Sequence, residues 1–116
     1  FGDGIERRVG DTTNVPAFLA CLRAAPLQPR RLPTAWVGAL IAWIKRIEAA
    51  PGSARHPVIV QGENDGTVDW PYNLAVLKAK FDTPRVLMLP GARHHLANEL
   101  PAIRQRYFDF LDLQIG

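Results

Sequence analysis

The chain has 116 residues, of which 47% are apolar and 22% are charged, so its composition is that of a globular domain and excludes a disordered polypeptide. No apolar run reaches the length that crosses a bilayer, and the basic residues behind the net charge of +3 are scattered, which excludes a transmembrane segment and a nucleic-acid platform. A single cysteine, Cys21, excludes an internal disulfide framework and favours the cytoplasm.

The first third of the chain predicts little regular structure. Residues 1–14 are rich in glycine, aspartate and arginine without periodicity, and they predict a loop or a frayed end to which we assign no function. Asn14 is suited to cap a short helix that ends before Pro26. On this helix we interpret Cys21 as a small apolar filler rather than a reactive thiol. Residues 26–33 contain three prolines and predict an extended connector.

The longest predicted helix begins at Thr34 and extends to about Ala49. Its apolar residues form two neighbouring stripes, so its apolar arc is wider than a surface helix needs. The stripes are Trp36, Leu40, Trp43 and Ile47, and beside them Val37, Ile41 and Ile44. We expect one side of this helix to pack on a sheet and the other side on a cap or on a second copy of the chain.

The second half of the chain predicts a βαβ unit followed by a helix that begins near Asn98 or Glu99. Residues 58–60 and 86–89 are short apolar runs between proline, glycine and polar residues, as in strands buried on both faces of a parallel sheet. Between them, apolar residues recur at helical spacing after Asp69, a suitable N-cap. A βαβ crossover is right-handed, so both strands point the same way and their carboxyl ends share one edge. The predicted fold class is α/β.

Two loops meet at this edge, and they carry the candidate chemistry. Residues 62–69 bring Asp65, and residues 91–95 bring His94 and His95. An acid and a histidine on adjacent loops are two members of a nucleophilic triad in the order acid, then histidine. Two structural interpretations compete. Asp65 before a glycine also suits a tight turn, and the two histidines with Glu99 are half of a metal site. Because no further ligand pattern completes a calcium or zinc site, we expect no metal and no cofactor.

The two loop sequences resemble the last two strand ends of an α/β-hydrolase. They read G-E-N-D-G-T-V-D and P-G-A-R-H-H-L-A-N-E-L-P, and they are most similar to the lysophospholipase and monoacylglycerol-lipase branch. In that branch the acid lies in a G-x-x-D-x-x-V loop, which falls on Asp65, and the base lies in G-A-x-H-x-x-x-x-E, which falls on His94. The resemblance implies a catalytic triad of a serine esterase or lipase, with a small-molecule or lipid ester as substrate. It also implies that residues 1–32 end a cap or lid and that residues 33–116 form the C-terminal βαβα part of the core.

The nucleophile of such a triad lies on a sharp turn between a strand and a helix, usually as G-x-S-x-G. The one serine of the chain, Ser53, follows a helix and precedes a strand, with Arg55 in place of the second glycine, so we do not expect it to be the nucleophile. The chain is also short for a whole α/β-hydrolase and begins at Phe1. We therefore expect a C-terminal fragment that supplies the acid and the base, is inactive alone and associates with itself.

Two other functions stay open at this stage. The resemblance extends to haloalkane dehalogenases and epoxide hydrolases, which use the same fold with an aspartate nucleophile that would also lie upstream. A non-catalytic interaction module that keeps both motifs as scaffold is the alternative from a different class. The residue at the nucleophile position, upstream of Phe1, would distinguish all three.

Overall fold

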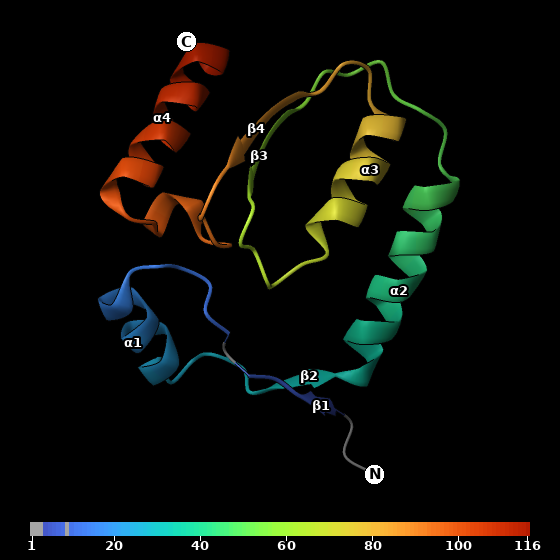
Figure 1. The fold of residues 1–116 in the computed structure, drawn as a ribbon. Helices are drawn as coiled ribbons and strands as arrows, with labels where there is room; N and C mark the ends of the chain where they lie inside the picture. Colours follow the sequence, from blue (N-terminus) through green and yellow to red (C-terminus); the bar gives the residue numbers. More distant parts are fainter. Residues whose placement is uncertain (1–3, 9) are drawn as a thin grey trace.

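The structure is a computed structural model that describes residues 4–8 and 10–116, and these residues form a mixed α/β arrangement (Figure 1). Four α-helices, one 3-10 helix and two sheets of two strands each are present among them. In chain order the elements are β1 (Gly4–Glu6), α1 (Pro16–Ala24), β2 (Arg31–Pro33), α2 (Thr34–Ala49), β3 (Val58–Gly62), α3 (Trp70–Lys80), β4 (Arg85–Leu89), η1 (Leu96–Asn98) and α4 (Pro101–Ile115).

The βαβ unit is confirmed. Strands β3 and β4 are parallel neighbours, in a register that runs from Val58 opposite Arg85 to Gly62 opposite Leu89. Helix α3 connects them, and the Asp69 carboxylate caps it by accepting a hydrogen bond from the Tyr72 amide at 3.4 Å. Both carboxyl ends therefore open on the same edge.

The expectation that both strands are buried on both faces is wrong. Val58 is 37% exposed, the middle of each strand is half-buried, and only the last residue of each strand, Gly62 or Leu89, is buried. The physical reason is that a sheet of only two strands is narrow, so the elements beside it leave the side chains on both faces partly open to solvent. Helices α3 and α4 lie on opposite sides of this pair and give it partial cover (Figure 1).

The N-terminal third contains structure that its sequence pattern did not predict. Strand β1 pairs antiparallel with β2, with Gly4 opposite Pro33 and Glu6 opposite Arg31. The Arg7 amide extends this pairing by donating to the carbonyl of Arg30 at 2.7 Å. The predicted loop and connector are therefore corrected to strands at residues 4–6 and 31–33, while residues 1–3 and 9 of the predicted loop or frayed end lie outside the described residues.

Helix α2 has the predicted bounds but not the predicted packing. It lies beside α3, which separates it from the β3–β4 pair (Figure 1). The Tyr72 hydroxyl on α3 donates a hydrogen bond to the Glu48 carboxylate, and the Lys80 ammonium donates one to the Glu48 carbonyl at 2.6 Å. The expectation that α2 packs on the sheet is therefore wrong, and Trp36 and Trp43 remain half-exposed.

The chain keeps a large accessible surface for its mass. Its 8315 Å² exceeds the about 6,300 Å² that scaling with mass gives for a compact monomer of 12.9 kDa. Among the described residues, the buried apolar side chains are those of Leu74, Leu89 and Ala92, and only the last two are fully buried. The best-packed region therefore lies where the carboxyl ends of β3 and β4 meet the following loops.

Helix α4 begins at Pro101, slightly later than predicted. Residues 96–98 form η1, and the side chain of Glu99 is buried rather than placed in a first helical turn. No helix within the described ranges is both long enough and apolar enough to cross a membrane.

Candidate active site

The structure brings Asp65 and His94 together. Asp65 follows β3, His94 follows β4, and Asp65 Oδ2 lies 2.8 Å from His94 Nδ1. The predicted meeting of an acid and a histidine at the carboxyl edge is therefore present in the fold. The Asp65 side chain is only 4% exposed, whereas that of His94 is 38% exposed, so the histidine is the member of the pair that is open to solvent.

The Asp65 carboxylate also shapes its own loop. Its Oδ1 accepts hydrogen bonds from the amides of Thr67 at 2.8 Å and Val68 at 3.4 Å, which is an Asx turn. Its Oδ2, besides facing His94, accepts from Gln61 Nε2 at 3.2 Å. The turn role and the pairing role, which compete as interpretations of the sequence, use different oxygens of one carboxylate.

The pKa of Asp65 reflects two opposed effects. Burial raises this pKa, but hydrogen bonds from His94, Thr67 and Gln61 together outweigh burial and hold the pKa below its ordinary value of 3.8. Asp65 is therefore ionised at neutral pH and is only an acceptor, so His94 Nδ1 must be the donor. In the neutral imidazole this leaves a lone pair on Nε2, to which no described residue bonds. That nitrogen is placed to act as a general base.

The two loops lie in direct backbone contact. The Glu63 amide donates to the Leu89 carbonyl at 3.1 Å, and the Asn64 amide donates to the Ala92 carbonyl at 2.9 Å. The approach needs a glycine at position 62, because a Cβ there would lie 2.4 Å from the Arg93 carbonyl oxygen. Gly62 is thus the residue that lets the acid loop and the histidine loop touch.

A buried carboxylate, Glu99, fixes the histidine loop. The residue is 1% exposed, and its Oε1 accepts from the Arg93 amide at 2.9 Å, while Oε2 accepts from the Leu100 amide at 3.1 Å. Asn14 donates to the same carboxylate through its backbone amide at 3.2 Å and its side-chain nitrogen at 3.0 and 3.1 Å. Because Arg93 precedes His94, these bonds hold the backbone that carries His94.

The prediction of Asn14 as a helix cap is wrong, since α1 begins after Val15 without a side-chain cap. Asn14 and its neighbours bind the histidine loop instead. The Thr13 hydroxyl donates to the Asn98 carbonyl at 2.7 Å, and the His95 amide donates to the Thr12 carbonyl at 2.8 Å. Residues 12–14, for which the sequence predicted no role beyond the helix cap at Asn14, therefore support the arrangement of the histidine loop. Glu99 could be found from the sequence, because it is the last residue of the G-A-x-H-x-x-x-x-E pattern. No signal in the sequence pointed to Asn14, its N-terminal partner.

Ser53 and His95, and also His56, which the sequence did not single out, lie apart from the pair or beside it. Ser53 forms an isolated bridge with Phe81 before β3 and β4 begin, so it lies near the amino ends of these strands. His56 is also at that end, with Nδ1 2.6 Å from the Asp82 carbonyl oxygen. His95 is half-buried, and its ring meets that of His94 edge-on at 5.5 Å.

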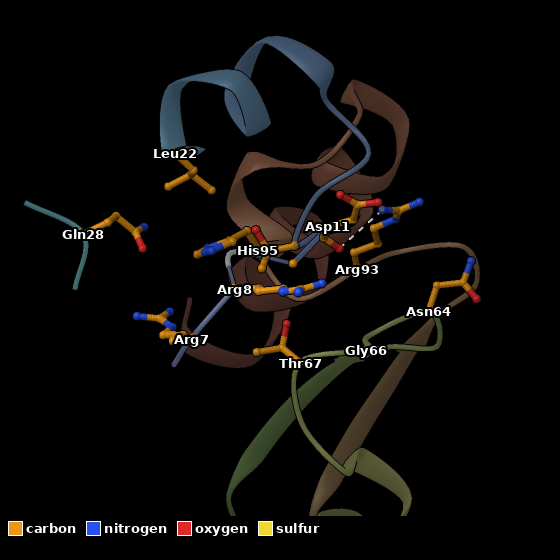
Figure 2. Close-up of a pocket in the computed structure, with 12 residues that line it drawn as sticks. Arg7, Arg8, Asp11, Leu22, Gln28, Asn64, Gly66, Thr67, Arg93 and His95 are labelled. Carbon is orange, nitrogen blue, oxygen red and sulfur yellow. Dashed lines mark hydrogen bonds and ion pairs between the residues drawn. The ribbon is translucent and has the colours of Figure 1, made fainter. Parts of the chain in front are cut away.

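A cavity of about 580 Å³ lies next to the pair, between the N-terminal segment and the two loops (Figure 2). The acid loop contributes Gly66 and Thr67, and the histidine loop contributes Arg93 and His95. The cavity is therefore built from the neighbours in sequence of both Asp65 and His94. In the part of the chain that the structure describes, no three His, Cys, Asp or Glu side chains are grouped as metal ligands.

Comparisons with protein-family models, with curated proteins and with solved structures find no match to this chain.

Proposed function

We propose that this chain supplies the acid and the base of a serine hydrolase that acts on carboxylic esters, with Asp65 as the acid and His94 as the base. The nucleophile in this proposal lies outside the 116 residues. One observation carries the proposal: the ionised Asp65 lies 2.8 Å from Nδ1 of His94 at the carboxyl edge of two parallel strands, and Nε2 faces away from it. An oriented histidine of this kind activates a hydroxyl nucleophile.

The proposed mechanism uses each atom of the pair. His94 Nε2 accepts the proton of the serine hydroxyl as its oxygen attacks the ester carbonyl, and then donates that proton to the departing alcohol. Asp65 keeps the proton on Nδ1 and stabilises the imidazolium that forms. A water molecule, deprotonated by the same Nε2, then attacks the acyl carbonyl; the bond to the serine oxygen breaks, Nε2 returns the proton to that oxygen, and the carboxylic acid is released.

The chain alone is expected to be inactive. Ser53 lies near the amino ends of β3 and β4, whereas His94 follows the carboxyl end of β4. A general base without a nucleophile contributes about 10²- to 10⁴-fold, which is far below the acceleration of an esterase.

The substrate class comes from the resemblance to the lysophospholipase and monoacylglycerol-lipase branch. We propose esters that carry an acyl chain. An aspartate nucleophile, as in dehalogenases and epoxide hydrolases, would use the same histidine to activate water, so the experiment must separate the two chemistries.

The test uses the complete protein encoded by the reading frame that contains these residues, incubated with a fluorophosphonate probe and with p-nitrophenyl esters. We expect labelling and turnover, with turnover lowered at least 10³-fold in His94→Ala. The matched controls are His56→Ala and Ser53→Ala, which change residues near the opposite end of the same strands and should leave both readouts unchanged. Absence of labelling and of ester turnover in the complete protein would refute the serine-hydrolase proposal.

A further inference from the structure

The cavity beside the proposed catalytic pair is cationic. Arg7 and Arg8 of the N-terminal segment and Arg93 of the histidine loop line it, with one carboxylate, Asp11, among them. Asp11 is already paired, because its carboxylate contacts the guanidinium of Arg93 at 3.3 Å and that of Arg23. Within the described residues, neither Arg7 nor Arg8 has a carboxylate partner, so their charges are available to a ligand.

Figure 2 shows how these side chains lie. Arg8 extends across the middle of the group, with Thr67 on one side and His95 on the other, and Arg7 lies next to it. Arg93, joined to Asp11 by an ion pair, closes the opposite side. Arg8 thus reaches the middle of this space from the N-terminal segment, while Arg7 and Arg93 lie on its two rims, with the guanidinium of Arg7 pointing outward.

Unpaired polar atoms also line this space. The Thr12 hydroxyl oxygen and the Gln28 amide oxygen are both buried, and neither has a hydrogen-bond partner among the described residues. Leaving such groups unpaired is costly. The Gln28 oxygen only accepts hydrogen bonds and so cannot bind an anion, whereas the Thr12 hydroxyl can. The Thr12 hydroxyl can donate to an anionic oxygen next to the guanidinium groups.

We propose that this cavity binds an anionic group of the substrate, a carboxylate or a phosphate, through Arg7 and Arg8, so that the site prefers esters that carry a negative charge. The substrate preference rests on the proposed function, whereas anion binding does not depend on it. Position supports the link: the cavity is lined by Arg93 and His95, which flank His94, and by Gly66 and Thr67, which follow Asp65. A guanidinium fork binds carboxylate and phosphate with paired hydrogen bonds.

The first experiment tests anion binding by the 116-residue chain with amide NMR titrations of inorganic phosphate, succinate and, as the neutral control, glycerol. We expect phosphate or succinate to shift the amides of Thr12, Thr67 and Arg93, with the tighter of the two identifying the anion source. Arg8→Gln should weaken binding about tenfold, because hydrogen bonds to charged groups are worth more than neutral ones.

Arg7→Gln is a second test variant and should weaken binding like Arg8→Gln. The matched control is Arg104→Gln, which removes one charge from the exposed surface of α4 and should leave binding unchanged. His94→Ala should leave anion binding intact. Equal shifts with glycerol, equal weakening by Arg104→Gln, or no anion binding would overturn the proposed site.

The second experiment tests the preference in the complete protein by comparing kcat/KM for 4-nitrophenyl hemisuccinate, which is anionic, and 4-nitrophenyl butyrate, which is neutral. Arg8→Gln should lower kcat/KM for the anionic ester about tenfold and leave that for the neutral ester unchanged, so the ratio of the anionic to the neutral value falls about tenfold. Arg104→Gln should leave this ratio unchanged. His94→Ala should lower both values alike. An unchanged ratio in Arg8→Gln would refute the substrate preference, whereas absence of turnover of both esters, with anion binding retained, would refute the hydrolase proposal alone.

Discussion

Replacing Gly62 by alanine should force apart the two loops that carry Asp65 and His94. The new Cβ would lie 2.4 Å from the Arg93 carbonyl oxygen and 2.5 Å from that of Ala92, and such contacts stay above 3.0 Å in real structures. Both obstacles are backbone atoms, so no side chain can turn away, and the loops must separate by roughly half an ångström.

This separation has a cost that the structure allows us to work out. Overpacking of a tight site costs about 1–3 kcal/mol. The hydrogen bond from the Asn64 amide to the Ala92 carbonyl, now 2.9 Å long, would be stretched toward the limit for such a bond. Its weakening adds about 1 kcal/mol to the cost. We therefore expect Gly62→Ala to lower the free energy of unfolding by about 2–4 kcal/mol and to lengthen the contact between Asp65 and His94.

The control is the other glycine of the same loop. A Cβ at Gly66 meets no atom within 4 Å, and its φ lies outside the left-handed region, so Gly66→Ala should be neutral or raise stability by about 0.4–1 kcal/mol. Urea unfolding followed by circular dichroism measures both variants, and imidazole ¹⁵N NMR reports the tautomer of His94. If the free energies of unfolding of Gly62→Ala and Gly66→Ala lie within about 0.5 kcal/mol of each other, the two loops do not approach as closely as described.

Three further predictions concern the supporting residues, the acid and the exposed helix. Glu99→Gln should lower the free energy of unfolding by roughly 2–4 kcal/mol in the same urea assay, because the new amide nitrogen would face hydrogen-bond donors. Glu63→Gln, which changes an exposed residue, should leave the free energy of unfolding unchanged. The depressed pKa of Asp65 contributes stability that is present above its ordinary value of 3.8 and is lost as pH falls through the folded pKa, so the stability difference between the wild type and Asp65→Asn should shrink below pH 3.8. The chain should associate with itself through α2 or the free edge of β3, and Trp43→Lys should shift it toward the monomer in light scattering. A wild type that stays monomeric at high concentration would contradict this last expectation.

The sequence predicted the parts of the fold that depend on local patterns and on topology. The apolar runs of β3 and β4, the helical spacing between them and the Asp69 cap predicted a parallel βαβ unit, and the shared edge then placed Asp65 near His94. These features need only neighbouring residues and the fixed handedness of the crossover.

The rest depended on contacts that no local pattern reports. Strands β1 and β2 have three residues each, which is too short for an alternating pattern. Asn14 is a good cap by residue type, but the buried Glu99 carboxylate, 85 positions away, offers it a charged partner and takes its side chain. The burial of β3 was overestimated because an apolar run shows what a strand can bury, not what covers it.

The bond between Thr13 and the Asn98 carbonyl has a consequence for the order of folding. It closes a loop of 85 residues, whereas Asp65 and His94 are separated by 29. The entropic free-energy cost of closing the longer loop is therefore higher by about 1 kcal/mol. The β3–β4 pair and its two loops can form first, and the N-terminal segment can dock on them afterwards. Thr13→Ala should then raise the unfolding rate constant and leave the folding rate constant nearly unchanged, because the lost contact is absent from the transition state. Stopped-flow kinetics would show this as a shift of the unfolding limb alone. The cavity lined by Arg7 and Arg8 would thus be the last part of the site to assemble and the first to open.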